Sequence, residues 1–120
     1  MRVRCESIVS ITGKEVDYHP GIKIGELYDV VSILCRTGRN PLIQILNGDR
    51  PSLWPSTMFT VVTPKIDPDW EIGISETGTI EIGPPKFQTP GFWELYFEDD
   101  PEALQIFDEE FLKHHRTSEQ

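Results

Sequence analysis

Runs of alternating or mainly apolar residues, typical of β-strands, occupy much of the first two thirds of the chain. The first run covers residues 3–11, and its arginine and glutamate side chains are expected to face water. A second run extends from Glu26 to Leu34 and a third from Leu42 to Leu46, with a proline-containing loop, 37–41, between them. The spacing therefore predicts a strand in each of these runs.

A tight turn is predicted at Asn47-Gly48, because Asn-Gly after an apolar run is the strongest short signal for a β-hairpin. The return strand is expected from Pro51 to Trp54. Pro55 lacks the N–H group that a central strand needs, so a short 3₁₀ turn is expected there. The β pattern then resumes at 60–62.

Residues 25–62 resemble the SH3-like small β-barrel found in uncharacterised bacterial proteins. The pieces that carry the resemblance are Gly25, Tyr28, Val30, Asn47-Gly48, Trp54-Pro55 and Phe59-Thr60-Val61-Val62. The resemblance covers under half of the chain and implies a small, strongly bent barrel. It implies no activity, because folds of this kind host unrelated functions.

Beyond the barrel, prolines and acidic residues mark a boundary near 64–69. Alternating isoleucines then predict a second hairpin, with strands at 70–75 and 80–82 around a turn at Glu76-Thr77-Gly78. The Gly-Pro-Pro sequence that begins at Gly83 ends this hairpin.

Two helices are predicted after the second hairpin. Thr89-Pro90 fits an N-cap followed by proline at the first helical position, which opens a short helix through Phe97. Asp100-Pro101 repeats the signal and predicts a helix from about 101 to 114. In these helices Trp93, Phe97, Phe107 and Phe111 are expected to attach the helices to the barrel.

The expected fold class is mainly β (α+β), with an SH3-like small barrel followed by a β-hairpin and two C-terminal helices. The barrel is placed at 1–64, and the hairpin and acidic helical lobe are placed at 65–120. A chain of 120 residues buries enough surface for the two parts to pack as one compact unit without disulfides.

Charge is distributed unevenly along the chain, whose net charge is −9. Residues 1–60 carry seven Lys or Arg against six acids, whereas residues 61–120 carry four against fourteen. Nucleic-acid binding depends on cations that neutralise phosphates, so nucleic acid is not an expected partner. Anionic membrane surfaces would repel the second half for the same reason. A protein with a basic surface is the natural complement.

The candidate partner-binding residues are acids and aromatic rings that lie close together in the second half: Trp93, Tyr96, Glu98, Asp99 and Asp100. Exposed rings surrounded by acids are typical of an interface that excludes water and attracts positive charge. An alternative site on the barrel would use Tyr28, Trp54 and Met58.

No motif in the chain carries recognisable enzymatic or metal chemistry, so neither a cofactor nor a metal is expected. His19, His114 and His115 lack the spacing of a zinc site, and the glycines form no phosphate-binding loop. Cys5 and Cys35 lie in apolar runs and are expected to be reduced, buried thiols. Without an apolar signal segment, a cytosolic location is expected.

Three functions follow as hypotheses. The first is a non-catalytic interaction protein that binds a basic partner, in one form an immunity or antitoxin-like protein that covers a basic toxin. The second is a structural domain that forms homo-oligomers through exposed strand edges. The third is a small-molecule binding or catalytic domain, which needs a concave and partly polar pocket between barrel and helices.

Overall fold

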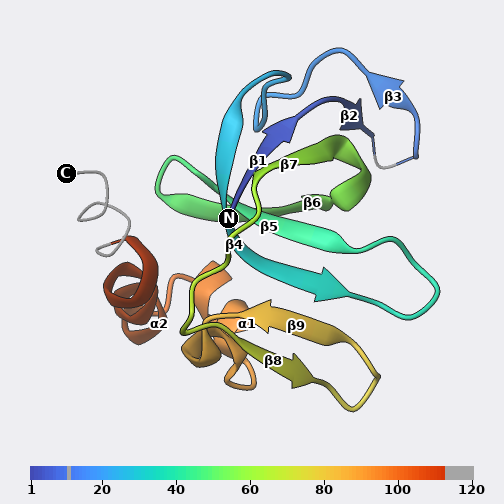
Figure 1. The fold of residues 1–120 in the computed structure, drawn as a ribbon. Coiled ribbons are helices and arrows are strands. Elements are labelled where there is room, and N and C mark those ends of the chain that lie inside the picture. The colour runs from blue at the N-terminus through green and yellow to red at the C-terminus, as the bar shows by residue number, and fades with distance from the viewer. Residues whose placement is uncertain (11, 113–120) are drawn as a thin grey trace.

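The computed structural model describes residues 1–10 and 12–112, and Figure 1 shows their arrangement. The strands of this part are β1 (Arg2–Cys5), β2 (Ile8–Val9), β3 (Glu15–Val16), β4 (Leu27–Cys35), β5 (Leu42–Asn47), β6 (Arg50–Pro55), β7 (Phe59–Thr63), β8 (Glu71–Ile74) and β9 (Ile80–Gly83). The helical segments are the 3₁₀ turns η1 (Ser56–Met58) and η2 (Pro85–Gln88), the α-helices α1 (Phe92–Phe97) and α2 (Pro101–Phe107), and the π-helical segment η3 (Asp108–Leu112).

The central strand of the fold is β4, which is nine residues long and pairs with three neighbours. Its first residues pair with β1, its last residues pair with β9, and β5 lies along its other edge. The sheet path runs β6-β5-β4-β1-β7, all antiparallel, and β2 and β3 form a separate two-stranded sheet. The β8–β9 hairpin therefore extends the same sheet as the first half of the chain.

The predicted fold class, mainly β with two C-terminal helices, is confirmed. The sheet path ends at β6 and β7 among the described residues, so a closed barrel is not shown and the SH3-like resemblance stays a prediction. The predicted boundary near 64–69 lies in the link between β7 and β8. Because β9 is hydrogen-bonded to β4, the sheet crosses this boundary.

The first predicted hairpin is confirmed, although its turn is one residue further along than the Asn-Gly signal indicates. Asn47 still pairs with Arg50, so the two loop residues are Gly48 and Asp49. Gly48 has a φ of 67°, a left-handed conformation that glycine adopts without steric cost. The 3₁₀ turn expected near Pro55 is η1, and the second predicted hairpin is β8–β9.

The helix starts agree with the sequence in one case and differ in the other. Asp100 caps α2 as predicted, because its carboxylate accepts a hydrogen bond of 3.0 Å from the Ala103 N–H. Helix α1 begins after Gly91 and not at Thr89-Pro90, since the chain from Pro85 forms η2 and Thr89 ends that turn. Helix α2 ends at Phe107 and continues as η3, and residues 113 and 114 lie outside the described part.

Two hydrophobic clusters lie on opposite faces of β4. Val30 and Val31 are consecutive residues of this strand, so their side chains point to opposite faces, and they belong to different clusters. The buried members of the first are Val3, Cys5, Ile8, Ile22, Tyr28, Val30, Ile43, Ile45 and Met58. Those of the second are Val31, Leu46, Phe87, Phe92, Tyr96, Ala103, Phe107 and Phe111. The second cluster attaches the helices to the sheet, and Figure 1 shows α1 behind the β8–β9 hairpin.

The predicted attachment residues are confirmed for Phe107 and Phe111, which are buried. Trp93 is half-buried and packs against the same cluster. The prediction is wrong for Phe97, whose side chain is 50% exposed at the last position of α1.

Candidate functional site

The predicted acids Glu98, Asp99 and Asp100 form the turn between α1 and α2, and two of them have structural roles there. Asp99 has a φ of 62°, the left-handed conformation of a residue that ends a helix. Asp100 is the N-cap of α2 and is half-buried. Glu98 and Asp99 remain exposed, so the structure keeps both on the surface.

Arg50 of the chain itself already pairs with an acid of this turn. The Arg50 guanidinium on β6 lies 3.4 Å from the Asp99 carboxylate, with both side chains more than half exposed. The same guanidinium lies 5.6 Å from the centre of the Tyr96 ring, within cation–π range. Exposed ion pairs contribute little stability, but this one lowers the negative charge that the turn offers to a partner.

The aromatic members of the predicted face are mainly core residues. Tyr96 is only 2% exposed and its ring packs 5.0 Å from that of Phe107, so a partner cannot contact Tyr96 directly. Burial raises the pKa of the Tyr96 hydroxyl, and Arg50 partly offsets this. The spacing of Phe92 and Tyr96, four residues apart on one helix, is the sequence signal of this buried stripe.

Trp93 is half-buried and lies beside a carboxylate from the sheet. Burial raises the pKa of Glu81 on β9, and a hydrogen bond from Trp93 opposes that rise. The Oε2 atom of Glu81 is buried without a hydrogen-bond partner among the described residues. Trp93 therefore belongs to the contact between α1 and the sheet.

The alternative site predicted for the first half of the chain is also mainly core. Met58 is fully buried and Tyr28 is 6% exposed, which removes both from any contact surface. Trp54 is half-buried, with its ring 4.8 Å from His19 and its indole N–H donating to the Ser52 hydroxyl at 2.9 Å. Trp54 alone of these three reaches the surface.

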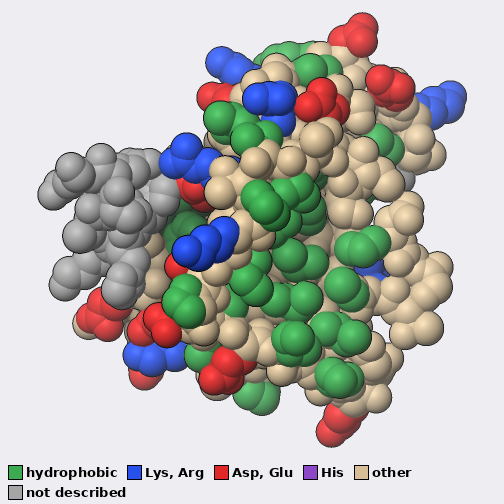
Figure 2. All heavy atoms as spheres, in the orientation of Figure 1, with side chains coloured by type: hydrophobic (Ala, Val, Ile, Leu, Met, Phe, Trp, Pro, Cys, Tyr) green, Lys and Arg blue, Asp and Glu red, His purple; other side chains and the backbone are tan. Residues whose placement is uncertain are grey.

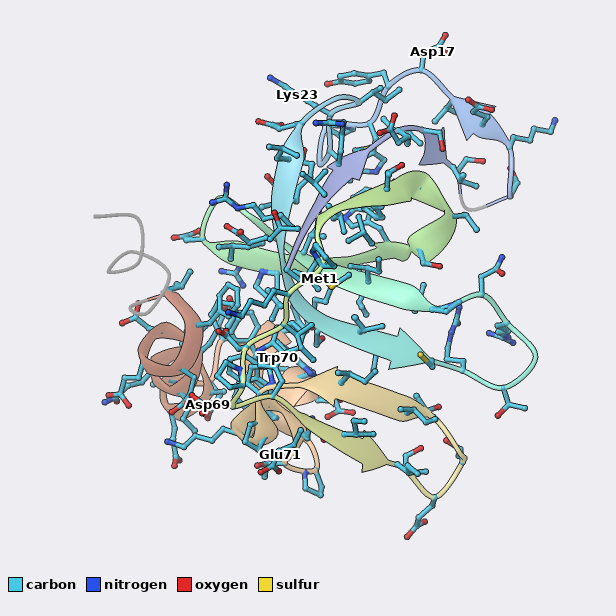
Figure 3. All side chains as sticks on the ribbon, in the orientation of Figure 1. Met1, Asp17, Lys23, Asp69, Trp70 and Glu71 are labelled. Atoms are coloured by element: carbon cyan, nitrogen blue, oxygen red, sulfur yellow. The ribbon has the colours of Figure 1, made fainter. Side chains whose placement is uncertain are left out.

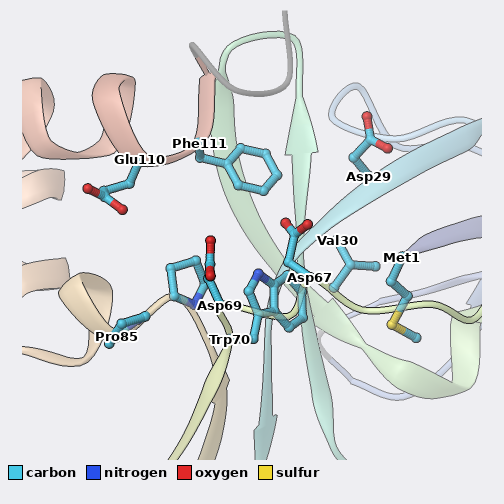
Figure 4. A pocket seen from close by; sticks show the side chains of 10 residues that line it. Met1, Asp29, Val30, Asp67, Asp69, Trp70, Pro85, Glu110 and Phe111 are labelled. Atoms are coloured by element: carbon cyan, nitrogen blue, oxygen red, sulfur yellow. The ribbon is translucent and has the colours of Figure 1, made fainter. Parts of the chain in front are cut away.

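A pocket of about 460 Å³, whose lining residues were not predicted from the sequence, lies between the sheet and the helical segment η3 (Figure 4). We call it the acidic pocket. Its apolar walls come from Met1, Val30, Trp70, Pro84, Pro85 and Phe111. Its carboxylates come from Asp29, Asp67, Asp69 and Glu110. The volume lies within the range of pockets that bind small ligands or side chains.

The link between β7 and β8 supplies two of the carboxylates and one aromatic ring of the acidic pocket. The Trp70 N–H donates to the Asp67 carbonyl at 3.1 Å, which closes a turn around Pro68 and Asp69. Figure 3 shows Asp69 and Trp70 where this link enters β8. Figure 4 shows the Asp67 and Asp69 carboxylates directed toward the space between the Trp70 and Phe111 rings.

The four pocket carboxylates differ in their partners. Asp29 lies 2.9 Å from the Arg2 guanidinium, and Glu110 lies 2.7 Å from the Lys86 ammonium. Glu110 raises the pKa of Lys86 through this hydrogen bond. Asp67 and Asp69 are exposed and form no ion pair with any described residue. The pocket therefore has two carboxylates whose charge the described chain does not neutralise.

This arrangement is suited to a cation that has an apolar or flat body. Carboxylates attract the charge, while the indole and phenyl rings accept its face or its methylene groups. The sequence gives one signal for it, the Asp67-Pro68-Asp69-Trp70 segment at the predicted boundary. That this segment and Phe111 line the same pocket depends on tertiary packing, which the periodicity of the sequence does not reveal.

A second surface feature is an apolar face on the β8–β9 hairpin. Ile72 and Ile74 of β8 are 69% and 72% exposed. Ile72 pairs with Ile82, which pairs with Ile33 of β4, so isoleucines line one row across the strands. Figure 2 shows hydrophobic side chains gathered on this side of the molecule. The outer edge of β8 pairs with no strand in the described chain.

Other chemistry is sparse in the described part of the chain. No group of three or more His, Cys, Asp or Glu side chains there is placed to hold a metal ion. Cys5 is buried and Cys35 half-buried, both as free thiols, and burial raises the pKa of Cys5. A thiol with a raised pKa is a poor nucleophile at neutral pH.

Within the described residues, every helix is too short or too polar to cross a lipid bilayer. Comparisons with protein-family models, with curated proteins and with solved structures found no match.

Proposed function

We propose that the chain is a non-catalytic, cytosolic interaction protein whose acidic half binds a basic surface of a partner protein. The observation that supports this most strongly is the acidic pocket, where Asp67 and Asp69 lie against aromatic walls without a cation from the described chain. An immunity or antitoxin-like role is one form of this function, in which the partner is a basic toxin.

Electrostatic attraction gives this proposal its physical basis. Residues 61–120 contain fourteen acids and only four Lys or Arg, so the second half of the chain creates a strong negative field. Such a field speeds the association of a basic partner and makes binding sensitive to salt. The pocket then provides a site in which a side chain of that partner is buried away from water.

The proposal predicts a salt-sensitive partner that needs the pocket aspartates. The tagged full chain is used to capture proteins from extracts of the cells that produce it, at low and at high ionic strength. Basic proteins should be retained at low salt and lost at high salt, because ions screen the attraction. The Asp67→Asn/Asp69→Asn variant should retain several-fold less of the same proteins.

A matched control removes the same charge elsewhere. Glu15 and Glu76 are exposed residues of β3 and of the turn between β8 and β9, and neither lines the pocket. The Glu15→Gln/Glu76→Gln variant should capture partners as the unmodified chain does. Retention that is insensitive to salt, or equal losses in both variants, would contradict a role for the pocket.

A second candidate function is homo-oligomerisation, which the isoleucine face and the unpaired edge of β8 favour. An exposed edge strand with apolar side chains can pair with another strand. Two copies of β8 that meet antiparallel would place Ile72 of each copy beside Ile74 of the other and bury the most exposed isoleucines.

Sedimentation over a wide concentration range tests this second candidate. The chain should form a dimer, and Ile72→Lys should remain a monomer because a charge on the edge strand opposes pairing. Ile72 is 69% exposed, so its replacement should leave the monomer folded. A chain that stays monomeric at millimolar concentration would remove this candidate.

A further inference from the structure

We infer that the acidic pocket receives an arginine side chain of the partner, an inference that rests on the proposed function and names what the pocket recognises. The pocket combines a volume of about 460 Å³, two carboxylates without a cation from the described chain, and flat apolar walls. Each of these properties restricts the occupant in a different way.

The walls favour a flat cation over a compact one. The Trp70 indole and the Phe111 ring flank the space toward which the Asp67 and Asp69 carboxylates point (Figure 4). A guanidinium is planar, stacks on aromatic faces and is weakly hydrated, so it enters such a space with little loss of solvation. A lysine ammonium is strongly hydrated and has no flat face to stack.

The carboxylates favour the same group. Asp67 and Asp69 are separated by one residue and line the same pocket, so both can accept N–H groups from one guanidinium. The four lining carboxylates come from separate segments of the chain, at position 29, at positions 67 and 69, and at position 110. Spread acids suit a large organic cation that donates in several directions.

The lining carboxylates differ in whether the chain itself supplies a cation to them. Arg2 pairs with Asp29 and Lys86 pairs with Glu110, so two of the lining carboxylates each hold a cation of the chain itself. Asp67 and Asp69 are therefore the two lining carboxylates that no cation of the described residues pairs with. The pocket is wider than one side chain needs, which leaves room for the neighbouring residues of an arginine-containing segment.

The test uses three short, blocked peptides that differ only at the central residue: arginine, lysine or citrulline, the neutral isostere of arginine. Each is titrated into the ¹⁵N-labelled full chain while amide signals are followed by NMR. The arginine peptide should shift the signals of Asp67, Asp69, Trp70 and Phe111. It should bind at least about tenfold more tightly than the citrulline peptide and several-fold more tightly than the lysine peptide.

Variants assign the binding to the pocket without disturbing the core. Asp67→Asn/Asp69→Asn changes two exposed side chains and should weaken arginine binding at least about tenfold, whereas Glu15→Gln/Glu76→Gln should leave it unchanged. Equal binding of the arginine and citrulline peptides would overturn the inference, as would shifts confined to residues outside the pocket.

The outcomes separate this inference from the proposed function. Equal binding of the lysine and arginine peptides, or no binding of any peptide, overturns the arginine inference. In either case, salt-sensitive capture of basic proteins that depends on Asp67 and Asp69 still supports the proposed function. If that capture also fails, the proposed function fails with it.

Discussion

Replacing Phe87 with alanine is expected to lower the free energy of unfolding by about 3–5 kcal/mol, measured by denaturant or thermal unfolding. Phe87 is 1% exposed, and its ring centre lies 5.1 Å from that of Phe92 and 5.3 Å from that of Phe107. These contacts connect η2 to both α-helices. A truncated side chain would leave a cavity where three helical segments meet the sheet.

Phe97→Ala is the control for this prediction because Phe97 is an aromatic residue of the same lobe that is 50% exposed. Its replacement should cost about 1 kcal/mol or less. Similar losses for the two variants would show that the second hydrophobic cluster does not determine the stability of the lobe.

Replacing Met58 with alanine is expected to cost about 2–5 kcal/mol, because the residue is fully buried in the first hydrophobic cluster. Met58 lies in η1, between β6 and β7, and its carbonyl accepts hydrogen bonds from the backbone N–H groups of Glu6 and Ser7. Chemical denaturation gives the change directly. The result separates a core role from the surface role that the sequence left open.

The neighbouring Thr57 supplies the matched control. Its side chain is exposed in the same 3₁₀ turn, so Thr57→Ala should change stability by about 0.5 kcal/mol or less. If Met58→Ala were equally mild, Met58 would not be buried in solution, and the alternative site with Tyr28 and Trp54 would return as a candidate.

Local signals predicted most of the elements correctly. The runs of apolar and β-branched residues located β4 and β5, and the Asn-Gly pair indicated the β5–β6 hairpin. Asp100-Pro101 located the start of α2, because both the cap and the proline act within one turn of helix. Thr89-Pro90 carries the same local signal, but no helix begins there. The preceding Pro84-Pro85 pair begins η2, and Thr89 is the residue at which η2 ends.

Burial was harder to predict, because it depends on which faces meet in the tertiary structure. Acids next to aromatics near Tyr96 indicated an exposed face, yet the ring packs against Phe92 and Phe107. The acids themselves remain outside, as expected for Glu98 and Asp99. Polar neighbours in sequence therefore do not place an aromatic side chain on the surface of a short helix.

The acidic pocket was missed for a related reason. Its carboxylates come from positions 29, 67, 69 and 110, and no spacing rule connects a strand, a link and a π-helical segment. The excess of negative charge in the second half was visible in the sequence, but the surface on which unpaired carboxylates gather was not. The structure favours the link before β8 over the α1–α2 turn, because Arg50 of β6 already pairs with Asp99 of that turn.

The most direct measurement is an NMR map of the full chain with a captured partner bound at low salt. Binding at the acidic pocket predicts that amide signals of Asp67, Asp69, Trp70 and Phe111 change first and that added salt reverses the changes. Signals of β2 and β3 should stay in place. Changes confined to β8 and its isoleucines, with the pocket signals unmoved, would contradict the proposal that a basic partner binds there.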